Sequence, residues 1–66
     1  MKIKITLDKY SSSMVNTDAL TTIIRELGSK ATIKGNEIIV DSFDETKVVD
    51  ILNRRGVTRY ERSQSY

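Results

Sequence analysis

The sequence predicts one α+β domain with a ferredoxin-like plait, in which a four-stranded antiparallel sheet carries two helices on one face. Three observations lead to this fold class. Residues 2–7 alternate between polar and apolar side chains, residues 16–28 and 42–56 carry apolar side chains at helical spacing, and two strand-like runs flank Gly35-Asn36. The resulting order is β-α-β-β-α-β, and right-handed crossovers leave the second face of the sheet open.

The length and composition restrict the possible chemistry. A chain of 66 residues forms one domain of marginal stability and has little room for an enclosed pocket. The sequence contains no Cys and no His, which removes the usual ligands of zinc, haem and iron–sulfur clusters and the bases of common nucleophilic enzymes. We therefore expect no enzymatic activity, no cofactor and no metal.

The hydropathy of the sequence predicts neither a membrane-spanning helix nor a signal peptide. The longest purely aliphatic run is residues 38–40, and the first seven residues, "MKIKITL", alternate Lys and Ile. A spanning helix needs about 20 apolar residues, and a signal peptide needs a continuous apolar stretch. We expect a soluble, cytoplasmic protein.

The first half of the chain shows a strand followed by a helix. Residues 2–7 predict a strand with one buried face. From Asn16 the apolar residues recur every three or four positions, which predicts a helix that Asn16 or Thr17 caps and Gly28 ends. The apolar stripe of this helix consists of Ala19, Leu20, Ile23, Ile24 and Leu27.

The middle of the chain predicts a hairpin with a defined register. Gly35-Asn36 is a two-residue turn of the kind that tolerates positive φ angles. This turn sets the cross-strand pairs Lys34–Glu37, Ile33–Ile38, Thr32–Ile39 and Ala31–Val40. The opposite charges of the first pair agree with the apolar pattern of the others.

The last part of the chain predicts a second helix and a final strand. Ser42 and Glu45 have the spacing of a capping box, and Gly56 ends the helix. The buried stripe consists of Val48, Val49, Ile51 and Leu52. A strand at residues 57–62 completes the domain, which spans residues 1–62, and residues 63–66 are expected to be a frayed C-terminal tail.

The open sheet face is the first candidate binding surface. Its expected members are Lys2, Lys4, Thr6, Thr32, Lys34, Glu37, Ile39 and Tyr60. Tyr60 depends on the phase of the last strand: if Val57 points inward, Tyr60 joins the open face, and if Tyr60 points inward, it caps the core. RNA-recognition domains share this plait, but they stack bases on aromatic residues of the two central strands. Residues 2–7 and 37–41 have no aromatic side chain.

Charged clusters near the second helix have two interpretations. The basic patch consists of Arg54, Arg55, Arg59 and Arg62. Its first two members complement the negative end of a helix, and all of them together suit a phosphate or an acidic partner. The acids Asp41, Asp44 and Glu45 are explained by their position at a helix N-terminus, which we favour over a metal site.

The serine loop "KYSSSMVN", residues 9–16, connects the first strand to the first helix. It has neither the paired thiols of copper-carrying plaits nor the glycine-rich turn and arginine of acylphosphatase-like ones. Hydroxyls before a helix can contact an anion, but we favour a connector in which Ser11, Ser12 and Ser13 bond to backbone donors.

Two functions from different classes remain. The favoured one is a small interaction module, either a regulator, an inhibitor or a small subunit, that binds a protein partner or a second copy through the open face or an edge strand. Small regulators, inhibitors and subunits of this length occur among the proteins of viruses and mobile elements. The alternative is a single-stranded nucleic-acid binder that uses the basic sheet face and the arginine-rich segment.

Overall fold

The structure is a computed structural model that describes residues 1–9 and 13–65. Its elements, in chain order, are β1 (Lys2–Leu7), α1 (Ser13–Leu27), β2 (Ala31–Lys34), β3 (Glu37–Asp41), α2 (Glu45–Arg54) and β4 (Tyr60–Ser65). Two single 3₁₀ turns, Gly28–Lys30 and Ser42–Asp44, lead into β2 and α2.

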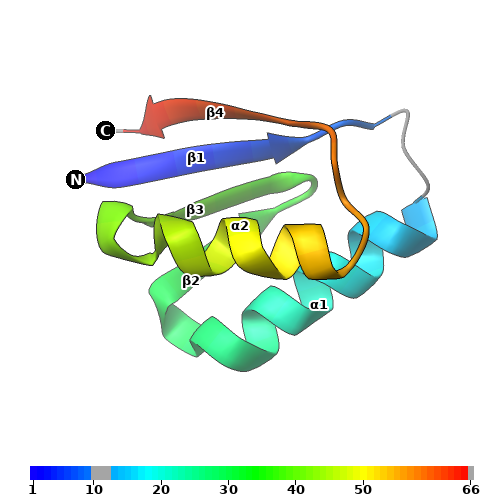
Figure 1. The fold of residues 1–66 in the computed structure, drawn as a ribbon. Coiled ribbons are helices and arrows are strands. Elements are labelled where there is room, and N and C mark those ends of the chain that lie inside the picture. Colours follow the sequence, from blue (N-terminus) through cyan, green and yellow to red (C-terminus); the bar gives the residue numbers. More distant parts are fainter. Residues whose placement is uncertain (10–12, 66) are drawn as a thin grey trace.

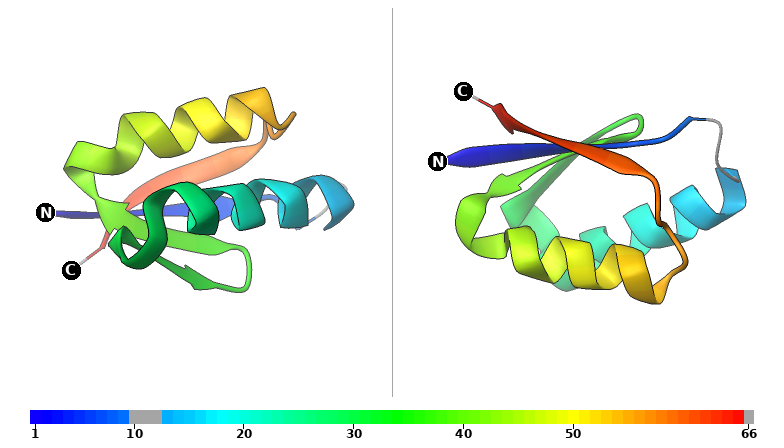
Figure 2. Two further views of the ribbon diagram at one scale, coloured as in Figure 1. Left: turned by 90° about the horizontal axis from the view of Figure 1, so that it is seen from below. Right: turned by 45° about the horizontal axis from the view of Figure 1, so that its top comes forward.

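The sheet has four strands in the order β2-β3-β1-β4, and all neighbouring strands are antiparallel. Both helices lie against the same side of this sheet, and the first and last strands, β1 and β4, lie side by side (Figures 1 and 2). The expected α+β class, with two helices and a four-stranded antiparallel sheet, is confirmed.

The core lies between the helices and one face of the sheet. In β1 burial alternates, so that Ile3, Ile5 and Leu7 point inward while their neighbours do not. The other fully or nearly fully buried apolar side chains in the described part of the chain are Ala19, Ile23, Leu27, Ile38, Val40, Val48, Ile51, Leu52 and Val57. Each large side chain of this set contributes about 1.5–3 kcal/mol by leaving water.

Helix α1 begins earlier than the sequence suggested. It starts at Ser13, so Asn16 lies inside the first turn and is not its cap. Asn16 is buried, and its side-chain amide Nδ2 donates to the Asp8 carbonyl at 3.1 Å, which ties α1 to the end of β1. Ile24, a member of the apolar stripe, lies at the flank of the stripe and is 52% exposed, so it is not part of the buried core.

The hairpin forms as the sequence predicted. All four predicted cross-strand pairs between β2 and β3 are present. Gly35 adopts a φ of +58°, a left-handed conformation that favours glycine over residues with a Cβ atom. The turn and the apolar pattern therefore specify the same register.

Helix α2 is not started by the predicted capping box. Asp41 instead accepts a hydrogen bond from the Phe43 backbone N–H at 3.1 Å and caps the 3₁₀ turn before the helix. Glu45 pairs with Arg62 of β4, because the 3₁₀ turn places Glu45 at the start of the helix rather than one turn beyond a cap. Phe43 projects from this turn with 91% of its surface exposed.

Strand β4 differs from the expectation in extent, and its pairing with β1 decides the phase that the sequence left open. It begins at Tyr60 and reaches Ser65, which pairs with Lys2, so residues 63–65 belong to the sheet and not to a frayed tail. Tyr60 pairs with Leu7, which places it on the helix side of the sheet, packed against the core. Val57 is also buried, because residues 57–59 precede the strand and do not follow its alternation.

The phase of β4 predicts how two neighbouring substitutions differ. Tyr60→Ala removes part of the core cover and should lower the free energy of unfolding by about 2 kcal/mol. Glu61→Ala, one residue on, points to solvent on the other face and should change it by less than about 0.5 kcal/mol. Urea unfolding of both variants measures the difference, and equal effects would contradict the observed register.

Candidate interaction surface

The open face is the side of the sheet that faces away from the helices, and its residues form three rows across the strands. The register places Lys34, Glu37, Thr6 and Glu61 in the hairpin row. The middle row consists of Thr32, Ile39, Lys4 and Ser63. The terminal row, at the end near Met1, contains Asp41 and Lys2.

The charges of the open face balance. Its three lysines, Lys2, Lys4 and Lys34, are matched among the described residues by three acids, Glu37, Asp41 and Glu61. The Lys4 ammonium lies 3.9 Å from a carboxylate oxygen of Glu37. A face without net charge gives little general attraction for phosphate.

Most of the predicted open-face residues do share this surface. Lys2, Lys4, Thr6, Thr32, Lys34 and Ile39 all point outward. Tyr60 does not, because its pairing with Leu7 turns it to the helix side. The outward positions of the described strands therefore carry no aromatic ring on which a base could stack.

Sequence reasoning missed Asp41 and Ser63 on this face, and it left Glu61 open because the phase of the last strand was undecided. The first ends β3, and its position in the sheet depends on the start of the next turn. The other two lie in β4, which is polar on both sides. A strand without apolar alternation gives no signal of phase, so only its pairing with β1 assigns these residues to a face.

The arginines of the predicted basic patch do not form a free cationic surface, and two of them bind acids on the helices. Arg54 lies 3.2 Å from Asp50 on the same helix and 3.9 Å from Glu26 of α1. Arg55 lies 3.8 Å from Asp18 of α1. The pairs with Glu26 and Asp18 connect the end of α2 to α1, whereas the pair with Asp50 lies within α2. Each such surface pair contributes about 0–1 kcal/mol.

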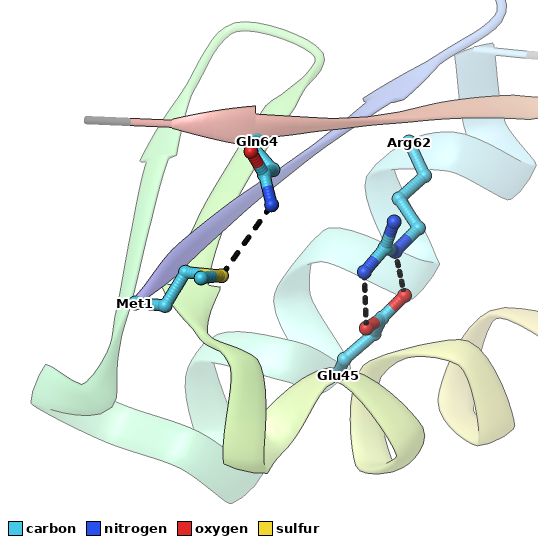
Figure 3. Close-up of polar contacts among 4 residues, drawn as sticks. All are labelled: Met1, Glu45, Arg62 and Gln64. Carbon is cyan, nitrogen blue, oxygen red and sulfur yellow. Dashed lines mark hydrogen bonds and ion pairs between the residues drawn. The ribbon is translucent and has the colours of Figure 1, made fainter.

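The other two arginines bind acids that are distant in the sequence. Arg59 lies 3.9 Å from Asp8. Arg62 points to the helix side of β4, where its guanidinium forms two hydrogen bonds with the Glu45 carboxylate (Figure 3). Hydrogen bonding to Glu45 raises the pKa of Arg62 above its ordinary value. All four arginines thus have a carboxylate partner, and the basic patch is neutralised locally.

A hollow of about 800 Å³, open to solvent, lies at the hairpin end of the open face. Because this hollow is open to solvent, it is not the enclosed pocket for which a domain of this size has little room. The charged residues of its lining are Asp8, Lys9, Lys34, Glu37, Arg59 and Glu61. Cations and carboxylates are equal in number there, so the hollow does not select a small ligand of one charge.

The acidic residues near α2 are engaged in other contacts. Asp41 caps the turn through Phe43, and Glu45 binds Arg62. In residues 1–9 and 13–65 no group of three or more acidic, His or Cys side chains is arranged to hold a metal ion. Within the same residues no helix is both long enough and apolar enough to cross a membrane.

Only part of the serine loop belongs to the residues that the structure describes. Ser11 and Ser12 lie outside the described residues. Ser13 begins α1 and is exposed.

The chain matches no protein-family model, no curated protein and no solved structure. Its geometry and charges are therefore the basis for any functional argument.

The capping hydrogen bond of Asp41 predicts how the free energy of unfolding changes at low pH. The hydrogen bond from the Phe43 backbone N–H is the main reason that the pKa of the Asp41 carboxyl lies below its ordinary value. The positive charges of the Met1 amine and of Lys2 lower this pKa further. A lowered pKa stabilises the fold above the unfolded-state pKa, near pH 4, and this stability is lost as the pH falls through the folded-state pKa.

Asp41→Asn should therefore flatten the pH dependence of the free energy of unfolding below about pH 4. Urea unfolding between about pH 2 and pH 6 measures it. Asp44→Asn is the matched control, because Asp44 lies in the same turn but makes no capping hydrogen bond. An unchanged slope in Asp41→Asn would show that the cap contributes nothing to the acid response.

Proposed function

We propose that the chain is a small non-enzymatic interaction module, acting as a regulator, an inhibitor or a small subunit, that binds a protein partner, either another protein or a second copy of itself, through the open face. The observation that carries this proposal is a sheet face with outward charges of both signs around the aliphatic Ile39, on the side opposite the helices. Protein interfaces use such complementary charge patterns for orientation and specificity.

The proposal takes the fold as a ferredoxin-like plait. The strand order β2-β3-β1-β4 and the position of both helices on one side of the sheet support this assignment. The plait hosts many unrelated functions, so the functional argument depends on the face and not on the fold.

The nucleic-acid alternative has less support. Affinity for a phosphate backbone comes from cations that release counterions, whereas the lysines of the open face are balanced by acids and the four arginines are paired. Stacking on aromatic side chains supplies the rest of single-strand affinity, and the described open face has no aromatic residue.

An edge strand is a second possible contact within the same proposal. β2 and β4 form the two edges of the sheet, and β4 is the longer at six residues. Charged side chains at an edge discourage unspecific pairing, and β4 carries Glu61 and Arg62. We therefore place the main contact on the open face.

Added bulk on the open face tests this function. Thr6→Arg/Thr32→Arg places two long side chains on that face, whereas Thr21→Arg/Thr46→Arg makes the same changes at exposed positions of α1 and α2. Each protein is immobilised, and bound proteins from a lysate of the source cell are quantified by mass spectrometry. A specific partner should be retained by the wild type and the helix variant and reduced at least about tenfold by the open-face variant.

If every retained protein binds both variants equally, the open face is not the binding surface. Thermal unfolding of the two variants by circular dichroism shows whether the comparison is made between folded proteins.

The nucleic-acid alternative is tested by fluorescence anisotropy. Labelled single-stranded RNA and DNA of about 20 nucleotides are titrated at about 50 mM and about 200 mM salt. We expect no saturable binding at micromolar protein concentration in either salt. Salt-sensitive micromolar binding that Lys2→Glu/Lys4→Glu abolishes would favour the nucleic-acid function instead.

A further inference from the structure

We propose that the partner fitted by the open face is a second copy of this chain, in a symmetric face-to-face dimer. This inference rests on the proposed function, because it uses the same surface. It depends on one property of that surface: the arrangement of its charges is complementary to itself under one particular two-fold rotation.

The rotation that brings complementary charges together has its axis between the two sheets and parallel to the strands. It places β2 of one copy over β4 of the other and β3 over β1, because the strand order is β2-β3-β1-β4. Each row then faces the same row of the second copy. Such a contact is isologous, so every favourable pair occurs twice.

In the hairpin row this arrangement joins the two residues at its ends. Lys34, on β2, faces Glu61 of the second copy, on β4. Neither residue forms an ion pair with another residue of the described chain. Within one chain they lie three strand spacings apart, about 14 Å, which is too far for direct pairing.

The other rows agree with the same rotation. In the terminal row, Asp41 of β3 faces Lys2 of the second copy on β1. In the hairpin row, Glu37 faces the neutral Thr6 of the second copy. In the middle row, Ile39 faces Lys4 of the second copy, whose aliphatic stem can cover it. No acid faces an acid, and no lysine faces a lysine.

A two-fold axis perpendicular to the strands is much less favourable. It would place the hairpin row over the terminal row, so that Glu37 would face Asp41 of the second copy. Like charges opposed in an interface are strongly unfavourable. The charges therefore select the axis parallel to the strands, which is also compatible with the aligned packing of sheets at about 30°.

The hollow extends the contact at the hairpin row. Lys34 and Glu61 both line it, so the ammonium of the second copy has open space in which to reach the carboxylate. The face measures about 14 Å across the strands and about 14 Å along them, an area of about 200 Å², which is small beside the roughly 800 Å² per partner of standard interfaces. We therefore expect a weak dimer with a dissociation constant in the micromolar to millimolar range, weakened further by salt.

Charge reversal at the two ends of the hairpin row tests the arrangement. Lys34→Glu would face Glu61 of the second copy, and Glu61→Lys would face Lys34 of the second copy, so each variant alone has two repulsive pairs. A one-to-one mixture of the two variants, however, forms two attractive pairs in the mixed dimer. Sedimentation equilibrium from about 10 µM to about 1 mM protein, at low and high salt, measures all these species.

We expect the wild type to dimerise at low salt, each single variant to dimerise at least about tenfold more weakly, and the mixture to recover wild-type association. The double variant Lys34→Glu/Glu61→Lys should also recover it. Lys47→Glu, on the exposed side of α2, makes the same change of net charge as Lys34→Glu and should leave the dimer intact.

Lys34→Glu places two acids opposite each other in the β2–β3 hairpin and could lower its stability. Glu61→Lys does not have this effect, because Glu61 pairs with the neutral Thr6, so this variant still tests the dimer. A wild type that stays monomeric at about 1 mM in low salt overturns the dimer. So does a mixture that associates no better than either variant alone. In both cases the capture experiment with the threonine variants still decides whether the open face binds a different protein.

Discussion

The pairing of β1 with both neighbours is the constraint on which the rest of the structure depends. β1 is bonded to β3 on one side and to β4 on the other, and its alternation sends Ile3 and Ile5 into the core and Lys4 outward. A shift of one residue would turn all these side chains to the opposite face. The buried isoleucines oppose that shift, so they also fix the positions of the charges on the open face.

The sequence predicts the fold well where local geometry and burial agree. In the hairpin, the Gly35-Asn36 turn and the pair Ile33–Ile38 specify one register, and the structure has it. In β4 no such agreement exists, because the strand is polar on both sides. The inward position of Tyr60 comes from its pairing with Leu7, a contact between distant parts of the chain that no local pattern encodes.

The sequence predicted which lysines lie on the open face, but it did not predict that acidic residues on the same face neutralise their charge. The lysines lie in strands whose phase the isoleucines reveal, whereas Glu61 lies in the strand of unreadable phase. The carboxylate partners of the basic patch could not be predicted for a related reason. Arg62 and Glu45 are 17 residues apart, and only the assembled fold brings them together (Figure 3). Counting charges along a sequence cannot show which of them cancel.

The start of β1 and the end of β4 are neighbours, because the two strands run antiparallel at one side of the sheet (Figure 1). Gln64 donates to the Met1 sulfur at 3.5 Å, and Lys2 pairs with Ser65. A short linker would therefore close the chain into a ring without crossing the core, and new termini could be opened at the exposed tip between β2 and β3. The β1–β4 pairing would then lie within a continuous hairpin, so a circularly permuted form should keep both the core and the outward face.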